Sequence, residues 1–206
     1  MWLLPLIRKK NLGLLPLIEA LWVYGSDTYR VPFSPGSLFP RGPLPLFPLT
    51  NVTQLRIDYL DIHSFLPRIR LCSGQLLPAL RELALEKPKG SCRELTFFIG
   101  LFQHLQDLKL FFVWSAYPEA PVGDLKLIPP FIPPLQGLLM VRGSMGVGLF
   151  RDMIDLFEGL RFRHMDLLGV GGMRFLLDAC AKTLESLVLD PSDPRGKHLS
   201  LMAHRF

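Results

Sequence analysis

The pattern that comes nearest to a cofactor site is the glycine loop at residues 143–148, Gly-Ser-Met-Gly-Val-Gly. A strand-like run, Leu138–Val141, precedes the loop, an amphipathic segment follows it, and Asp166 comes about twenty residues later. A strand, a glycine turn, a helix and an acidic residue in this order form a dinucleotide site, where the glycines admit the pyrophosphate and the carboxylate binds the ribose. A nucleotide-binding enzyme that uses residues 143–148 is therefore one interpretation.

Several details favour a structural role for these glycines instead. Their order is G-x-x-G-x-G rather than G-x-G-x-x-G, no Walker lysine follows them, and strand-like residues continue after Asp166. The five histidines show no H-E-x-x-H and no metal-ligand spacing with cysteine, and there is no G-x-S-x-G. We therefore expect no enzymatic activity, no cofactor and no metal, and we interpret the glycines as a tight turn.

Residues 91–110 predict one helix followed by one strand. Ser91 and Glu94 have the spacing of a capping box, in which each side chain accepts a hydrogen bond from the other residue's backbone N–H. Apolar residues then recur at helical spacing, and the period changes to that of a strand at Leu108 and Leu110. A helix and a strand this short cannot bury their apolar faces alone, so the unit requires copies of itself.

Copies with the pattern L-x-x-L-x-L recur along the chain at intervals of 22 to 30 residues. The residues at the centre of the copies are Leu55, Leu83, Leu108, Leu138, Met165 and Leu187. The interval is close to the 20–29 residues of leucine-rich repeats. Amphipathic segments at 148–160 and 172–183 predict helices between the later copies. The fold class expected is an α/β leucine-rich-repeat solenoid, an irregular horseshoe arc of about six strand–helix repeats with a parallel sheet on its concave face.

Alternation along each strand assigns side chains to the core or to the concave face. It places Leu108 and Leu110 in the core, and it exposes Leu139 and Val141 in the fourth copy. The concave face then carries charges of both signs, which favours a protein partner. The candidate contact residues are Arg56, Glu82, Glu86, Asp107, Lys109, Phe111, His164 and Asp166.

Three regions follow from this pattern. Residues 1–50 are expected to be an apolar cap, with a short helix that opens in residues 14–18 and continues through Leu21, and a proline-rich loop, because six prolines fall within residues 31–50. Residues 51–190 form the repeat domain, and residues 191–206 a polar tail. The tail is too short and irregular to cover the last strand, so we expect self-association through the unpaired edge of residues 184–189.

Composition narrows the class of partner. Hydrophobic residues make up 49% of the 206 residues and charged residues 20%, which favours a folded core over disorder. The net charge of +5 is not organised into a basic stripe with interleaved aromatics, so no nucleic acid is expected. No apolar run is long enough to span a bilayer, and no secretory signal is visible, so no membrane partner and an intracellular location, cytoplasmic or nuclear, are expected. Three separated cysteines, Cys72, Cys92 and Cys180, favour free thiols.

Residues 80–190 resemble the leucine-rich-repeat-like proteins of mushroom-forming fungi, many of which are described as F-box or F-box-like. The resemblance rests on SCRELTFFIGLFQHLQDLKL at 91–110, LIPPFIPPLQG at 127–137, FRDMIDLFEGLRFRHMDL at 150–167 and MRFLLDACAKTLESLVLDPSDPRG at 173–196. It implies a non-enzymatic protein-binding module that recognises substrates for a ubiquitin ligase, with ligase subunits as partners. The chain departs from the family pattern because residues 1–50 show no three-helix F-box and because the usual asparagine after each repeat is missing.

Overall fold

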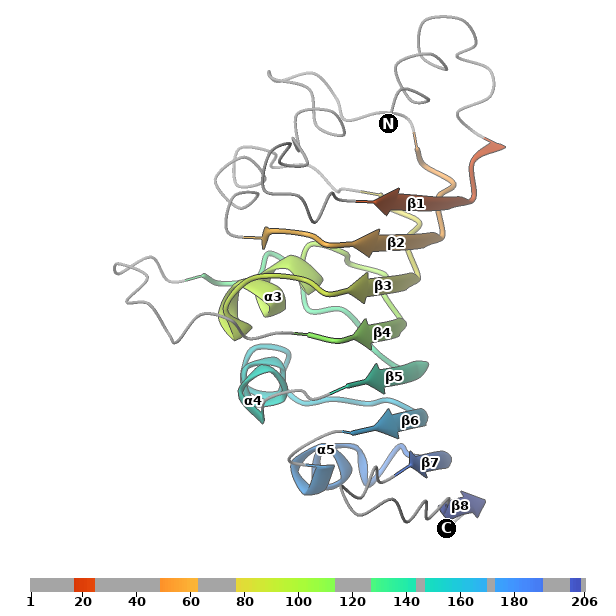
Figure 1. The fold of residues 1–206 in the computed structure, drawn as a ribbon, viewed down its shortest axis with the longest axis vertical. Coiled ribbons are helices and arrows are strands. Elements are labelled where there is room, and N and C mark those ends of the chain that lie inside the picture. The colour runs from red at the N-terminus through yellow and green to blue at the C-terminus, as the bar shows by residue number, and fades with distance from the viewer. Residues whose placement is uncertain are drawn as a thin grey trace, which may run out of the picture.

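The computed structural model describes residues 17–24, 49–62, 77–113, 127–143, 147–169, 173–190 and 201–204. These residues form an α/β structure around one sheet of eight strands, whose order in the sheet follows their order in the chain (Figure 1). Strands β1 to β7 pair in parallel, and β8 pairs antiparallel with β7. The strands are β1 (Ala20–Tyr24), β2 (Gln54–Asp58), β3 (Glu82–Glu86), β4 (Asp107–Phe111), β5 (Leu138–Arg142), β6 (His164–Leu168), β7 (Ser186–Asp190) and β8 (Leu201–His204).

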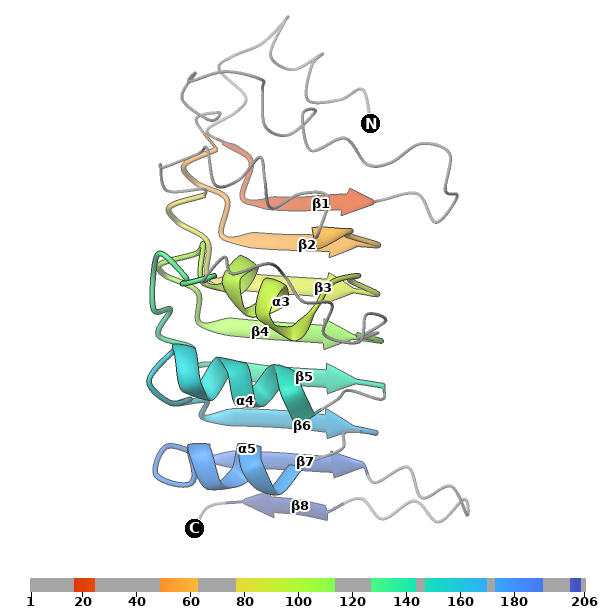
Figure 2. The same ribbon diagram turned by 90° about the vertical axis from the view of Figure 1, so that its left-hand side faces the viewer.

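The helices lie on one side of the sheet (Figure 2). They are α3 (Cys92–Ile99), α4 (Val147–Leu156) and α5 (Met173–Cys180), which precede β4, β6 and β7 in the chain. Residues 127–137, which lead into β5, contain no helix. The other face of the sheet carries none of these helices, and we call it the open face.

The capping box at the start of α3 is confirmed. The backbone N–H of Glu94 donates to Ser91 Oγ at 3.2 Å, and the backbone N–H of Ser91 donates to Glu94 Oε2 at 2.8 Å. Leu95 and Phe98 are then buried on the sheet side of the helix. The helix ends at Gly100, where an added Cβ would lie 2.4 Å from Cβ of Pro129. The glycine thus allows the proline-rich residues before β5 to pack closely against the end of α3.

Backbone carbonyls connect successive strands where the strands begin. Five of these carbonyl oxygens each accept two consecutive N–H groups from the entry to the next strand, at 2.7–3.2 Å. They belong to Glu19, Thr53, Arg81, Gly137 and Arg163. The ten donors of these bonds are all backbone N–H groups, so widely different residues can occupy the position.

Left-handed residues follow the strands where the strands end. The residue after each of β2 to β6 has a positive φ. These residues are Tyr59, Lys87, Phe112, Gly143 and Gly169, with φ of 59°, 48°, 49°, 97° and 70°. The N–H of each of the first four donates to the last carbonyl of the next strand at 2.8–3.0 Å. The turns are therefore closed by backbone geometry, without an asparagine at these positions.

The hydrophobic core lies between the sheet and the helices. Each central strand contributes two fully buried side chains, such as Leu83 and Leu85 in β3 and Leu108 and Leu110 in β4. The strands pair in register, so that Leu55, Leu83 and Leu108 form one continuous row. The predicted alternation is therefore confirmed for these strands. Their apolar side chains stack into rows that a single strand could not bury by itself.

The alternation predicted for the fourth copy is wrong. Leu139 and Val141, which were expected to be exposed, are both fully buried, and Leu138 instead lies on the open face. The register pairs Leu108 with Leu139, so Leu139 lies four positions after Leu135, whereas Leu108 lies only three positions after Leu105. The additional residue is accommodated by a left-handed Leu135, with φ of 42°.

The sheet also extends beyond the predicted repeat domain at both ends. The helix expected over residues 14–21 is wrong at Ala20 and Leu21, because Ala20–Tyr24 is strand β1 and pairs with β2, while residues 14–16 lie outside the described residues. The unpaired edge expected at 184–189 is also wrong, because β8 pairs along β7 from Ser186 to Leu189. Both expectations failed because an existing strand edge offers hydrogen bonds to any extended neighbour, which local residue patterns do not reveal. The proline-rich part of residues 31–48 lies outside the described residues.

Candidate functional site

The structure brings all eight predicted contact residues together on the open face, spread over β2, β3, β4 and β6. Strand alternation explains the arrangement, because every second residue of each strand must leave the core. Most of the charged groups on this face are already paired with a neighbour, as the contacts below show.

Arg56 is the centre of a cluster on β1 to β3. Its Nε donates to Asp58 at 3.0 Å, its Nη2 donates to Glu86 at 2.5 Å, and its guanidinium lies 4.8 Å from the ring centroid of Trp22. Trp22 Nε1 also donates to Asp58 at 2.8 Å, and the Asp58 carboxylate is buried beneath the two side chains. The hydrogen bond to Asp58 is the main cause that raises the pKa of the Arg56 guanidinium. Trp22 itself remains 66% exposed, so this cluster presents an aromatic ring on a charged base.

The middle of the open face is covered by a second ion pair. Lys109 Nζ donates to Glu82 at 2.7 Å, and the side chains from the neighbouring strands leave Ala84 only 6% exposed. Asp107 has a structural task, because its Oδ1 accepts the N–H of Leu138 at 2.5 Å. This bond replaces the second carbonyl bond that the other strand entries have, and it accompanies the additional residue before β5.

The part of the face formed by β5 to β7 is more apolar. Arg142 forms a bidentate ion pair with Asp166, and His164 Nδ1 lies 2.8 Å from Ser186 Oγ. Leu138 and Met140 are partly exposed between these polar pairs. The face therefore changes along the sheet from a cluster rich in charges to a surface where apolar side chains separate the pairs.

In the described part of the chain, Gly143 and Asp166 of the predicted nucleotide site each have a structural role. Asp166 lies in the middle of β6 and pairs with Arg142, whereas a ribose-binding carboxylate lies at the end of a strand. Gly143 has φ of 97° and closes the turn after β5, where an added Cβ would lie 2.9 Å from Phe112 Cδ1. Residues 144–146 of the loop lie outside the described residues.

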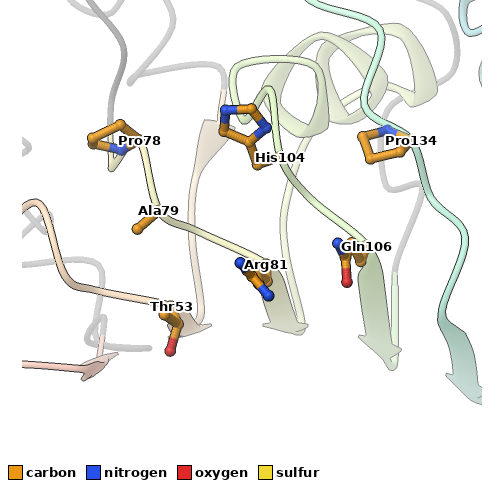
Figure 3. A pocket seen from close by; sticks show the side chains of 7 residues that line it. All are labelled: Thr53, Pro78, Ala79, Arg81, His104, Gln106 and Pro134. Carbon is orange, nitrogen blue, oxygen red and sulfur yellow. The ribbon is translucent and has the colours of Figure 1, made fainter.

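A shallow pocket of about 560 Å³ lies where β2, β3 and β4 begin. Thr53, Arg81 and Gln106 each directly precede one of these strands, and His104 lies on the turn before β4. Figure 3 shows Pro78 and Pro134 at opposite sides of the pocket with His104 between them, and Arg81 and Gln106 beneath. The wall is completed by Ala79, and none of the lining residues is acidic.

Residue patterns missed Trp22, Asp58, Arg142 and this pocket. The run Leu-Trp-Val-Tyr at residues 21–24 is rich in strand-forming types and was a usable signal for Trp22. The position of Arg142 on the open face follows only from the corrected register of β5. The pocket residues come from four successive repeats, and no single motif connects them.

Comparisons of the chain with known protein families, with curated protein sequences and with solved structures found no match. In the described residues no helix has the length and apolar character needed to cross a bilayer. The same residues contain no group of three or more histidine, cysteine or acidic side chains arranged to hold a metal ion.

Proposed function

We propose that the protein is a leucine-rich-repeat solenoid that binds another protein through the open face of its sheet, without catalysis. The observation that carries this proposal is the open face itself: β1 to β7 present one continuous surface in which paired charges alternate with exposed aromatic and aliphatic side chains. Such a mixture suits a protein surface, because interfaces combine aromatic and apolar contacts with charges that select the partner.

Independent binders selected from a random peptide display library test this proposal. Most selected binders should depend on the open face, so Met140→Arg should weaken them at least tenfold. Ile128→Arg is the matched control, because Ile128 is 64% exposed but lies outside the sheet. Binders that are weakened equally by both variants, or that ignore Met140→Arg, would contradict the proposal.

The resemblance of residues 80–190 to fungal F-box-like proteins supports a narrower proposal, that the bound protein is a substrate of a ubiquitin ligase. The chain would then supply substrate recognition, and a ligase subunit would bind either this chain or a companion. Copurification of tagged protein from a mushroom-forming fungus, with quantification of ligase subunits, tests this proposal. Recovery of ligase subunits no greater than with an unrelated bait would reject it.

A further inference from the structure

We propose that the pocket at the beginning of β2 to β4 binds a carboxylate, supplied by an acidic side chain of the protein partner. The inference rests on the proposed protein-binding function and adds a specific contact to it. Arg81 supplies the charge, Gln106 and His104 supply further hydrogen-bonding groups, and Pro78 and Pro134 form the apolar walls.

The first argument is charge balance. Three cations of the open face are already matched: Arg56 by Asp58 and Glu86, Lys109 by Glu82, and Arg142 by Asp166. Arg81 is different, since it is exposed, its pocket has no acidic lining residue, and it forms no ion pair among the described residues. An anion from outside can therefore bind there without displacing an existing carboxylate.

The second argument concerns the neighbouring carboxylates. Glu82 and Asp107 follow Arg81 and Gln106 directly in the chain, and a carboxylate near the pocket repels an anion. Glu82 is neutralised by Lys109 at 2.7 Å, and Asp107 accepts the N–H of Leu138 at 2.5 Å. Asp107 keeps its charge, but neither carboxylate is among the groups that line the pocket, so Arg81 is the permanently charged side chain that an incoming anion meets there.

The third argument selects a carboxylate over a phosphate. One guanidinium matches a planar carboxylate in shape and in charge through two parallel hydrogen bonds. A phosphate dianion needs more cations than this pocket offers, where Arg81 is joined only by neutral groups and a histidine. A volume of about 560 Å³ exceeds the needs of a free ion and accommodates a side chain with its adjoining backbone.

The pocket also lies where a partner on the open face would reach it. Thr53, Arg81 and Gln106 are each followed by the first open-face residue of their strand. Substitution of Arg81 should leave the fold intact, because its backbone carbonyl and N–H, and not its guanidinium, connect β2, β3 and β4.

Nuclear magnetic resonance titration of the full chain tests the inference without a known partner. N-acetyl-aspartate amide should shift the Arg81 Nε–H and Gln106 side-chain signals in a saturable manner, whereas the neutral N-acetyl-asparagine amide should not. Arg81→Gln should weaken the acidic probe at least tenfold. Arg163→Gln is the matched control, because Arg163 occupies the same position before β6 but lies outside the pocket, and it should have no effect.

Equal shifts from the two probes, absence of saturation, or equal losses in the two arginine variants would overturn the inference. Tighter binding of inorganic phosphate would overturn the choice of a carboxylate. The result is separable from the proposed function: if displayed peptides ignore the open face while the acidic probe still saturates the pocket, the protein-binding proposal fails and the anion site stands. If the acidic probe does not bind while the selected peptides still depend on the open face, the anion site is rejected and the protein-binding proposal stands.

Discussion

The two faces of the parallel sheet follow opposite rules. On the buried face, Leu55, Leu83, Leu108 and Leu139 form one row in which every member is aliphatic and at most 5% exposed. On the open face, the neighbouring row runs from Trp22 through Arg56 and Ala84 to Lys109, and changes type at every strand. Burial restricts the first row to one chemistry, whereas the second is constrained only by pairing with its neighbours. The open face can therefore vary in sequence to suit a partner without loss of the fold.

The largest expected difference between the faces is at β5, where adjacent residues point in opposite directions. Leu139→Lys should destabilise the protein by about 4 kcal/mol or more, because the ammonium would be buried without a partner. Leu138→Lys should change the free energy of unfolding by less than about 0.5 kcal/mol, since Leu138 is partly exposed. Chemical denaturation of both variants measures the difference. A larger effect of Leu138→Lys than of Leu139→Lys would support the alternation expected from the sequence, in which Leu138 is buried and Leu139 is exposed.

Truncation of a single core side chain is the next largest effect. Leu108→Ala should cost about 2–5 kcal/mol, through lost apolar contact and the cavity that remains. Leu108 is fully buried in β4 and stacks between Leu83 and Leu139. Urea unfolding followed by circular dichroism measures this cost. A loss below about 1 kcal/mol would show that the core relaxes into the space, contrary to the packed row described above.

The thiol of Cys180 should make stability depend on alkaline pH. Burial raises the pKa of this thiol from its ordinary 9.0 to about 11. Between about pH 9 and 11 the folded protein thus retains the thiol proton that the unfolded chain loses. The contribution of the thiol to the stability is therefore complete below about pH 9 and is lost as the pH rises toward 11. Between pH 8 and 11 the midpoint temperature of thermal unfolding should fall less steeply for Cys180→Ala than for the wild type. Parallel curves would show that the thiol has no such role.

The cap of α3 is expected to have a smaller effect. Ser91→Ala removes the oxygen that accepts the N–H of Glu94 and should cost about 1 kcal/mol. Ser91→Asp is the matched control, because an aspartate can accept the same bond and should retain most of the stability. Denaturation curves of the three proteins separate these cases. An unchanged free energy of unfolding for Ser91→Ala would show that the cap does not stabilise the protein.

The smallest effect is expected on the open face. Lys109→Ala removes the ion pair with Glu82, whose two side chains are each 26% exposed, and should cost about 0.5 kcal/mol or less. The difference between wild type and variant should shrink in high salt, because screening weakens the pair. A cost comparable with that of Leu108→Ala would mean that the open face also holds the fold together, and would remove the contrast between the faces.

The sequence by itself determined the features that depend on local periodicity. The capping box of Ser91 and Glu94, the helices near 92–99, 147–156 and 173–180, and five of the six predicted strands with their alternation follow from residue types and spacing. All eight predicted contact residues therefore lie on the face that was expected to carry them. Their role in binding a protein stays a prediction.

Only the tertiary structure decided the features that depend on a neighbour. The register of β5 is set by pairing of Leu108 with Leu139, which overrides the nearer match of Leu138 to the repeat pattern because the core row must remain aliphatic. Strands β1 and β8 exist in the sheet because β2 and β7 offer free edges to pair with. The ion pairs of Arg56 with Glu86 and of Arg142 with Asp166 join residues more than twenty positions apart, and the pocket around Arg81 collects residues from successive repeats, which the stacking of repeats brings together.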